Sequence, residues 1–303
     1  MLSKDQTRQF RDQGYVVARG LLDGARVAAL TGEIDAWIEE SRAHQVNYGE
    51  TMDGKARFDL EAGHTAERPR LRRVANPADI SAAYRSALWD GPIVDAVAEL
   101  IGPDVKFHHC KLNIKLPGME TRVDYHQDHA YDPHTNDDML SMALLLDQVT
   151  EENGCLRVVP GSHRERYSHY RDGKFVGATD PALDAEFERR SLPVTGAAGD
   201  VCLMHTWTVH GSGPNRSERP RRLLICDYVA ADAYPLTAPA VPSPHTGRIV
   251  RGKPARKARL VADSIELPTP YEDDSFFGLQ GQKSQMADVR YQVSEEDEPV
   301  SDT

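Results

Sequence analysis

Cysteine is scarce in this chain, with four residues among 303, and no two of them form a C-x-x-C pair. A zinc ribbon depends on closely spaced cysteine pairs, so this class of site is disfavoured. The opening residues also contain no apolar core of a secretory signal. Scattered thiols without such a signal are typical of a reducing compartment. The sequence therefore predicts a cytoplasmic protein.

Long apolar runs and excess positive charge are also missing. The longest apolar stretch, residues 142–146, is far shorter than the roughly 18 residues that a membrane span requires. The formal net charge is −11, whereas nucleic acids and anionic membranes are bound by clustered Lys and Arg. We therefore expect a small-molecule substrate as partner, with no nucleic acid and no membrane, and a protein that is a monomer or a homodimer.

The first third of the chain has helical patterns. Ser3 and Gln6 form a capping box for a first helix, and Asp23 precedes a longer helix with apolar residues on one face. Asp90 is the expected cap of a further helix that Gly102 and Pro103 end. The intervening residues 47–70 are polar, and we expect them to form an irregular loop beside the functional site.

From residue 105 the pattern alternates, as in β-strands. Over residues 107–116 one face is apolar, while the other carries His109, Lys111, Asn113 and Lys115. The simplest interpretation of the polar face is exposure to solvent; the alternative is a ligand-binding face. Further strands are expected at residues 139–147, 156–159, 201–205, 208–210 and 222–229. Helices followed by many short strands indicate a mainly β protein with flanking helices and a jelly-roll core.

The predicted organisation is a single domain, residues 1–303. Its parts are a helical N-terminal part (1–104), a jelly-roll core (105–230), a C-terminal extension or lid (231–290) and a disordered tail (291–303). Within the core, residues 164–190 form a charged insertion. Within the extension, the aromatic residues 271–279 are expected to fold back as a lid.

A possible metal centre is encoded by two separated segments. His126 and Asp128 are two residues apart on a predicted strand, so their side chains project to the same side. His210 ends a later apolar strand, just before a glycine-rich turn. Two histidines and one carboxylate form the facial triad of non-haem Fe(II) oxygenases, which leaves coordination positions open. A lone H-x-D is a weak signal, so the third ligand and its surroundings carry weight.

Arg221 strengthens this interpretation. It follows His210 by eleven residues and begins the next apolar strand. A guanidinium can bind a carboxylate with two parallel hydrogen bonds, as a dicarboxylate cosubstrate chelated to iron would require. We expect an antiparallel hairpin after His210 to bring Arg221 beside the metal. The simpler alternative is a solvated surface charge, because other arginines are close by.

Three motifs in this order resemble the phytanoyl-CoA dioxygenase family, to which bacterial ectoine hydroxylases belong. They are HQDHAY at residues 126–131, NGCLRVVPGSH at 153–163, and HGSGPN at 210–215 followed by Arg221. The resemblance covers residues 107–229 and the opening helices, about two-thirds of the chain. It implies a double-stranded β-helix of the cupin-like, jelly-roll type, and hydroxylation of a small molecule with Fe(II), 2-oxoglutarate and O2, releasing succinate and CO2.

The same resemblance assigns site residues by position. His126, Asp128 and His210 would hold iron, while Arg221, Ser212 and Asn113 would bind 2-oxoglutarate. His109, Lys111 and Tyr131 are the candidates for substrate binding, and no separate catalytic acid or base is required. Related halogenases have a small residue in place of the aspartate, so Asp128 favours hydroxylation or a related desaturation or epoxidation. Tyr131 and Asp132 stand where ectoine hydroxylases have a tryptophan, which disfavours ectoine as the substrate.

Two alternatives remain open at this point. One is a cupin-like metal enzyme, an isomerase or a cosubstrate-independent dioxygenase, which would use the same His/Asp/His site without needing Arg221. The other is a non-catalytic β-barrel that has lost its metal.

Overall fold

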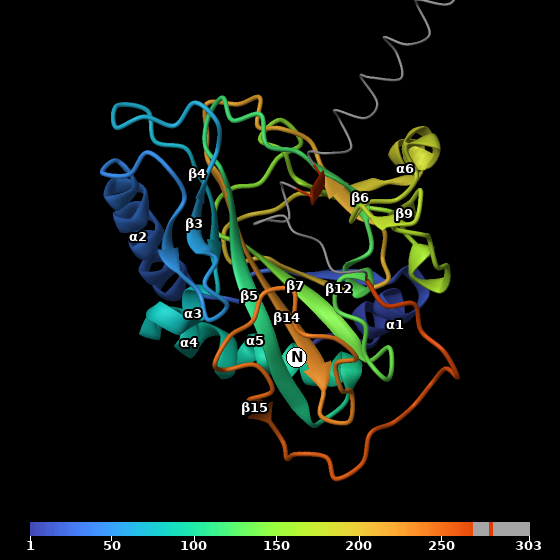
Figure 1. Ribbon diagram of the computed structural model, residues 1–303. Coiled ribbons are helices and arrows are strands. Elements are labelled where there is room, and N and C mark those ends of the chain that lie inside the picture. Colours follow the sequence, from blue (N-terminus) through green and yellow to red (C-terminus); the bar gives the residue numbers. More distant parts are fainter. Residues whose placement is uncertain (269–278, 281–303) are drawn as a thin grey trace, which may run out of the picture.

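The computed structural model describes residues 1–268 and 279–280. The N-terminal elements are α1 (Lys4–Gln13), β1 (Tyr15–Ala18), α2 (Gly24–Ser41), β2 (Tyr48–Glu50), β3 (Ala56–Leu60), β4 (Leu71–Ala75), α3 (Pro77–Ile80), α4 (Ala82–Trp89) and α5 (Pro92–Ile101). The later elements are β5 (Val105–Lys115), β6 (Val123–His126), β7 (Met139–Leu145), β8 (Leu156–Val158), β9 (Tyr170–Arg171), β10 (Lys174–Phe175), α6 (Asp184–Arg190), β11 (Leu192–Val194), β12 (Val201–His205), β13 (His210–Ser212), β14 (Arg221–Ala230) and β15 (Ile249–Arg251). Figure 1 shows their arrangement.

The helix starts follow the capping chemistry in two of three cases. Ser3 and Gln6 form the predicted capping box of α1, and Asp23 caps α2 through the backbone N–H of Arg26. The prediction for Asp90 is wrong, because this residue ends α4 and Gly91 is the cap of α5. Pro92 sets the start, since its missing N–H and fixed φ suit the first helical position.

A large antiparallel sheet runs through the centre of the molecule (Figure 1). Its strand order is β1-β12-β7-β14-β5-β4-β3-β2, with β15 also paired to β5. The strands β5 and β14 are paired along almost their whole lengths, from Arg221 opposite Lys115 to Ala230 opposite Val105. Two strands, β2 and β3, fall within residues 47–70, so the predicted irregular loop is wrong there. Burial of Phe58 and Leu60 on β3 explains why this polar segment joins the sheet.

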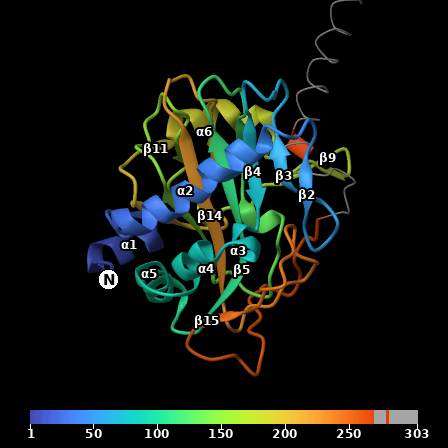
Figure 2. The ribbon, with the colours of Figure 1, turned by 90° about the vertical axis from the view of Figure 1, so that its left-hand side faces the viewer.

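Helices cover one face of the large sheet, and a smaller sheet faces the other. Figure 2 shows α2, α4 and α5 lying across the large sheet, and their apolar residues share one buried cluster with those of β5, β7 and β14. The smaller sheet has the order β11-β8-β13-β6. A second apolar cluster joins the two sheets through Val158 and Val194 on one side and Leu145 and Leu223 on the other. Two antiparallel sheets packed in this way confirm the jelly-roll prediction.

The polar face of β5 points inward. Cys110, Leu112 and Ile114 pack into the cluster beneath the helices, as predicted. His109 and Lys115, on the opposite face, are also buried, so the solvent-facing interpretation of this strand is wrong. The second sheet covers that face, and it therefore lines the interior of the jelly roll.

The described part of the C-terminal extension returns to the core. Strand β15 pairs with β5, and the Tyr170 hydroxyl donates a hydrogen bond to the carbonyl of Leu267. Leu279 packs with Tyr131 and Phe175. The rest of the predicted lid and the predicted disordered tail lie outside the described residues. Among the helices of the described part, none has the length and apolar character of a membrane span. All four cysteines are free and buried.

Candidate metal centre

His126 and His210 come from neighbouring strands of the smaller sheet. They are direct partners in the antiparallel pairing of β6 and β13, and their ring centroids are 4.2 Å apart. Both imidazoles are buried. The register of this strand pair therefore brings together two histidines that are distant in sequence.

Asp128 completes the group although it is not on a strand. β6 ends at His126, Gln127 keeps an extended backbone, and Asp128 begins a short 3-10 turn. Its carboxylate lies 3.4 Å from Nε2 of His126 and 3.6 Å from Nε2 of His210. The Gln127 side chain instead hydrogen-bonds to the carbonyls of Glu165 and Trp207. The predicted side-chain alternation thus places His126 and Asp128 together even though the strand has ended.

The hydrogen bonds of the two histidines leave ligand atoms facing the group. Nδ1 of His126 donates to the Asp124 carbonyl at 2.8 Å, and Nδ1 of His210 donates to the Thr208 carbonyl at 2.9 Å. A neutral imidazole that donates from Nδ1 carries its lone pair on Nε2. Burial lowers the pKa of His210 to about 4, which keeps it neutral. Two Nε2 atoms and a carboxylate within 4.8 Å of one another are suitable donors for a divalent metal.

Ser141 links Asp128 to a second carboxyl group. Its Oγ lies 2.6 Å from Oδ2 of Asp128 and 2.6 Å from Oδ1 of Asp227. One hydroxyl proton cannot serve two carboxylates, so one of the carboxyl groups must donate. Burial, followed by the charge of Asp128, raises the pKa of Asp227 to about 7. In its protonated form Asp227 donates to Ser141, which in turn donates to Asp128 and holds its orientation.

These two partners of Asp128 were not identified from the sequence. Ser141 lies inside an apolar strand, and Asp227 is one charged residue in another. The only available signal was a polar residue at an inward position in each strand. Ser141 and Asp227 are 86 residues apart in the sequence, so their contact is not evident from either strand alone.

Arg221 lies at the other end of the same interior space. It is 2 % exposed, and it donates hydrogen bonds to the carbonyls of Gly154 and Asn113. Burial lowers its pKa to about 10, so it stays charged near neutrality. The predicted hairpin is wrong: β13 belongs to the smaller sheet and β14 to the larger one. Arg221 shares a cavity with the metal-ligand group because the two sheets enclose one space.

Three polar residues surround Arg221. Asn113 lines the cavity, and its buried amide oxygen has no hydrogen-bond partner among the described residues. Ser212 also lines the cavity and accepts a hydrogen bond from Nζ of Lys115 at 2.7 Å. Burial, with the nearby Arg221 charge, holds the pKa of Lys115 well below its ordinary value. Lys115 is thus a further residue at this end of the cavity, and the sequence indicated only its strand face.

One cavity of about 50 Å³ contains both the metal-ligand group and Arg221. Strands of both sheets contribute to its wall. Its lining residues are Arg73, Lys111, Asn113, Val123, His126, Asp128, Ser141, Ala143, Leu156, Met204, His210, Ser212, Arg221, Leu223 and Ile225. The predicted metal and cosubstrate residues therefore share a single space, with room for small ligands.

The three predicted substrate-binding residues have different surroundings. Lys111 lines the cavity. The ring of Tyr131 packs edge-on against His126, while its hydroxyl donates to the carbonyl of Gly177. The nitrogens of His109 face other protein groups, with Nδ1 2.7 Å from His108 and Nε2 3.4 Å from Asp227.

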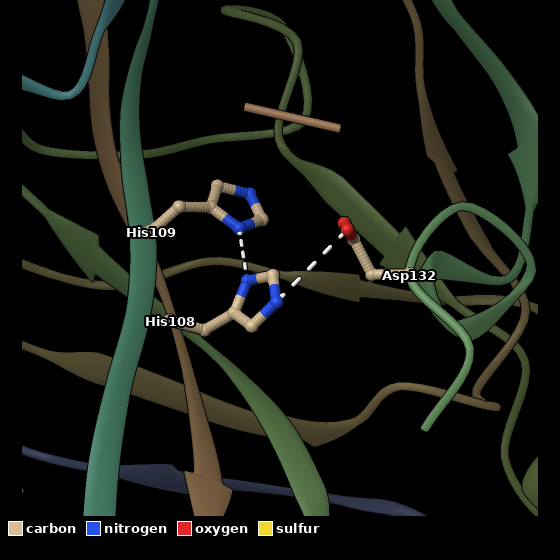
Figure 3. A group of neighbouring side chains, drawn as sticks. All are labelled: His108, His109 and Asp132. Atoms are coloured by element: carbon tan, nitrogen blue, oxygen red, sulfur yellow. Dashed lines mark hydrogen bonds and ion pairs between the residues drawn. The ribbon is translucent and has the colours of Figure 1, made fainter. Parts of the chain in front are cut away.

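A second group of possible ligands lies beside this site. Figure 3 shows His108 and His109 projecting from β5 toward Asp132. The two consecutive histidines lie together because the pairing of β5 and β14 shifts register between Asp227 and Tyr228. The Nδ1–Nδ1 contact of 2.7 Å is a hydrogen bond in which one ring donates and the other accepts. We therefore interpret this group as a buried hydrogen-bond network.

The end of α1 supports the segment that carries His210. Gly14 has φ 81° and ends this helix. Its carbonyl accepts hydrogen bonds from the Thr208 hydroxyl and from the His205 backbone N–H. The Thr208 carbonyl in turn holds Nδ1 of His210. A Cβ at residue 14 would lie 2.5 Å from the Thr208 hydroxyl, so glycine is required both by conformation and by space.

The chain is similar to known proteins along most of its length. Residues 10–223 match the family described as phytanoyl-CoA dioxygenase (PhyH). A probable alpha-ketoglutarate-dependent hypophosphite dioxygenase of Stutzerimonas stutzeri is 33% identical over 274 residues, which cover 88% of this chain and 92% of the relative. A 2-aminoethylphosphonate dioxygenase from an uncultured bacterium is 29% identical, covering 75% of this chain and 81% of that protein.

A solved structure is similar along most of the chain. The crystal structure of EctD from S. alaskensis with bound Fe has a TM-score of 0.63 and 26% identity, covering 86% of this chain and 88% of that one. The family match spans well over half of the sequence, and the hypophosphite relative spans most of it. The chain belongs to the phytanoyl-CoA dioxygenase (PhyH) family.

Proposed function

We propose that this protein is an Fe(II)- and 2-oxoglutarate-dependent dioxygenase that hydroxylates a small metabolite and releases succinate and CO2. The observation that carries the proposal is one cavity with two imidazole Nε2 atoms and a carboxylate at one end and the buried Arg221 at the other. A cosubstrate-independent enzyme would have no use for a buried guanidinium in that position. Family membership supports the same reaction class.

Each group of residues has a distinct role in this proposal. His126, Asp128 and His210 hold Fe(II), and Ser141 keeps the Asp128 carboxylate in place. When bound, Fe(II) supplies the centre at which O2 is activated as the cosubstrate is decarboxylated.

The cosubstrate residues are those at the other end of the cavity. Arg221 binds the distal carboxylate of 2-oxoglutarate, with Ser212 and Asn113 assisting. The enclosing sheets exclude water from the reacting groups. Substrate, O2 and 2-oxoglutarate give hydroxylated substrate, succinate and CO2, and one oxygen atom enters each of the first two products.

We further propose that the substrate is a small phosphorus-centred oxyanion. Two relatives that cover most of this chain are named for hypophosphite and for 2-aminoethylphosphonate. Both compounds present negatively charged oxygens on phosphorus. With hypophosphite as substrate, one P–H bond becomes P–OH, and the product is phosphite.

The reaction class can be tested without the true substrate. Anaerobic addition of Fe(II) and 2-oxoglutarate to the purified protein should give the visible charge-transfer absorption of a 2-oxoglutarate–iron chelate. If the reconstituted protein binds iron but its activity does not depend on 2-oxoglutarate, the result would instead favour the cosubstrate-independent alternative. Succinate release on addition of hypophosphite or 2-aminoethylphosphonate then tests the substrate class.

A further inference from the structure

Two cationic side chains, Arg73 and Lys111, line the metal cavity on neighbouring strands. In the pairing of β4 with β5, Arg73 lies opposite Asn113, and Ala75 lies opposite Lys111. Arg73 and Lys111 are therefore diagonal neighbours on one face of the sheet. Residues in this relationship are about 7–8 Å apart, so their long side chains can reach one small ligand.

Lys111 lies away from the cosubstrate end of the cavity, and Arg73 lies between the two, opposite Asn113. Arg221 lies opposite Lys115 on β5, four residues from Lys111. At about 3.3 Å per residue, the two points on the strand are roughly 13 Å apart. A five-carbon dicarboxylate that extends from the metal to Arg221 places its distal charge away from Lys111. A second anion is the ligand that this pair would take.

The surroundings favour an anion at this position. Arg73 is 7 % exposed, so an ion pair with it would be shielded from water and stronger than on the surface. The pKa of His109 is held well below its ordinary value by burial first, then by His108, and also by the charges of Lys111 and Arg73. This places the two positive charges in the same neighbourhood.

We propose that Arg73 and Lys111 form an oxyanion subsite that binds the substrate beside the metal. Arg73 presents two parallel N–H donors to two oxygens of the anion, and Lys111 acts as a point charge on the same group. The inference rests on the proposed function, because it assigns the substrate end of that site. It adds Arg73, which no motif in the sequence indicated, and makes this residue a determinant of specificity.

Four variants test the subsite in the iron-reconstituted enzyme. Arg73→Gln and Lys111→Met each remove a charge, and Arg73→Lys keeps the charge but not the paired donors. Arg72→Gln is the matched control. Arg72 directly precedes Arg73 on β4, but it pairs with Asp59 at 2.9 Å and does not line the cavity. Circular dichroism establishes that each variant is folded. Arg73→Lys and Lys111→Met keep the test decisive if Arg73→Gln does not fold.

The measurements separate substrate binding from cosubstrate binding. Hypophosphite and 2-aminoethylphosphonate are titrated into the anaerobic Fe(II)–2-oxoglutarate complex, and the change in its visible absorption gives a Kd without turnover. We expect Arg73→Gln and Lys111→Met to weaken binding about 10- to 100-fold, the range for a lost hydrogen bond to a charged group. Arg73→Lys should recover part of the loss. The affinity for 2-oxoglutarate should not change in these variants, and Arg72→Gln should match the wild type.

Each other result overturns the inference in a recognisable way. A rise in the Kd of 2-oxoglutarate instead would assign the two cations to the cosubstrate. Equal oxyanion binding in all variants would exclude the subsite. Failure of the wild type to bind either oxyanion, despite a normal Fe(II)–2-oxoglutarate absorption, would reject the substrate class while the dioxygenase assignment stood. Absence of that absorption in the wild type would reject the proposed function itself.

Discussion

His126 and His210 face each other across two antiparallel strands, with ring centroids 4.2 Å apart. The pairing of β6 and β13 carries both ligands, so the metal centre depends on strand register as well as on residue type. A shift of one residue in either strand would turn one imidazole to the opposite face of the sheet. Asp128, just beyond the end of β6, then closes the group from a third direction.

Replacing Asp128 with alanine should abolish succinate formation. The variant keeps both histidines but lacks the carboxylate that lies within 3.6 Å of each of their Nε2 atoms. We expect the iron content after anaerobic reconstitution to fall as well, because two imidazoles alone hold a divalent metal weakly. The measurement is succinate release together with bound iron per chain. Near-normal turnover in this variant would remove Asp128 from the metal centre.

Replacing Arg221 with lysine should raise the KM for 2-oxoglutarate by about 10- to 100-fold, because the bidentate contact with the distal carboxylate is lost. Arg222→Lys is the matched control. Arg222 is the next residue on β14, but its guanidinium pairs with Asp147 at 2.7 Å and with Asp35 at 2.6 Å. The control should alter stability and leave this KM unchanged. Equal KM effects in the two variants would show that Arg221 does not contact the cosubstrate.

Replacing Ser141 with alanine should weaken iron binding or activity by about 10- to 100-fold, the usual effect of removing a partner of a metal ligand. The Asp128 carboxylate would lose the hydrogen bond that orients it. Ser243→Ala provides the comparison, because Ser243 is also buried and donates to a carboxylate, Asp79, at 2.6 Å. Iron titration of both variants distinguishes a specific effect from general destabilisation. Identical iron affinities would contradict the role given to Ser141.

The stability of the iron-free protein should rise as the pH increases from about 4 to about 6.5. Burial lowers the pKa values of several histidines from 6.5 to about 3 or 4, so in this window their unfolded forms bind protons that the folded forms do not. These histidines are His108, His129, His134, His169 and His205. Each proton bound only by the unfolded chain adds about 1.4 kcal/mol per pH unit to the slope.

Two carboxyl groups oppose this trend. Burial raises the pKa of Asp132 to about 6 and that of Asp227 to about 7, so their folded forms hold protons that the unfolded forms release. Their stabilising effect is lost as the pH rises through these values. The histidines are more numerous, and the net slope should therefore be positive below pH 6.5. Urea unfolding at a series of pH values measures it. A flat or falling stability over this window would show that the buried histidines are not neutral.

The sequence predicted those parts of the site that local patterns determine. The H-x-D spacing places His126 and Asp128 on one side, and the alternation of β5 places Asn113 and Lys111 on one face. The jelly roll followed from many short alternating strands after helices. These features depend on neighbours in the chain, and local geometry carries them directly into the structure.

The parts that were missed depend on contacts between distant segments. Arg73 lies on β4, which pairs with β5 on one side and with β3, in the segment interpreted as a loop, on the other. Asp227 and Ser141 meet because two strands pair in one register. The hairpin predicted between His210 and Arg221 was wrong for the same reason, because no local pattern indicates that the chain crosses from one sheet to the other after β13. Tertiary packing determines all three.

The contact between Gly14 and Thr208 has a practical consequence for anyone who produces this protein. The first helix ends on the segment that presents His210, through hydrogen bonds that leave no space for a larger residue at position 14. Trimming the first fourteen residues, or rigidly fusing a tag into them, would remove a brace of the iron pocket while leaving the barrel strands intact. We expect preparations shortened in this way to load metal poorly.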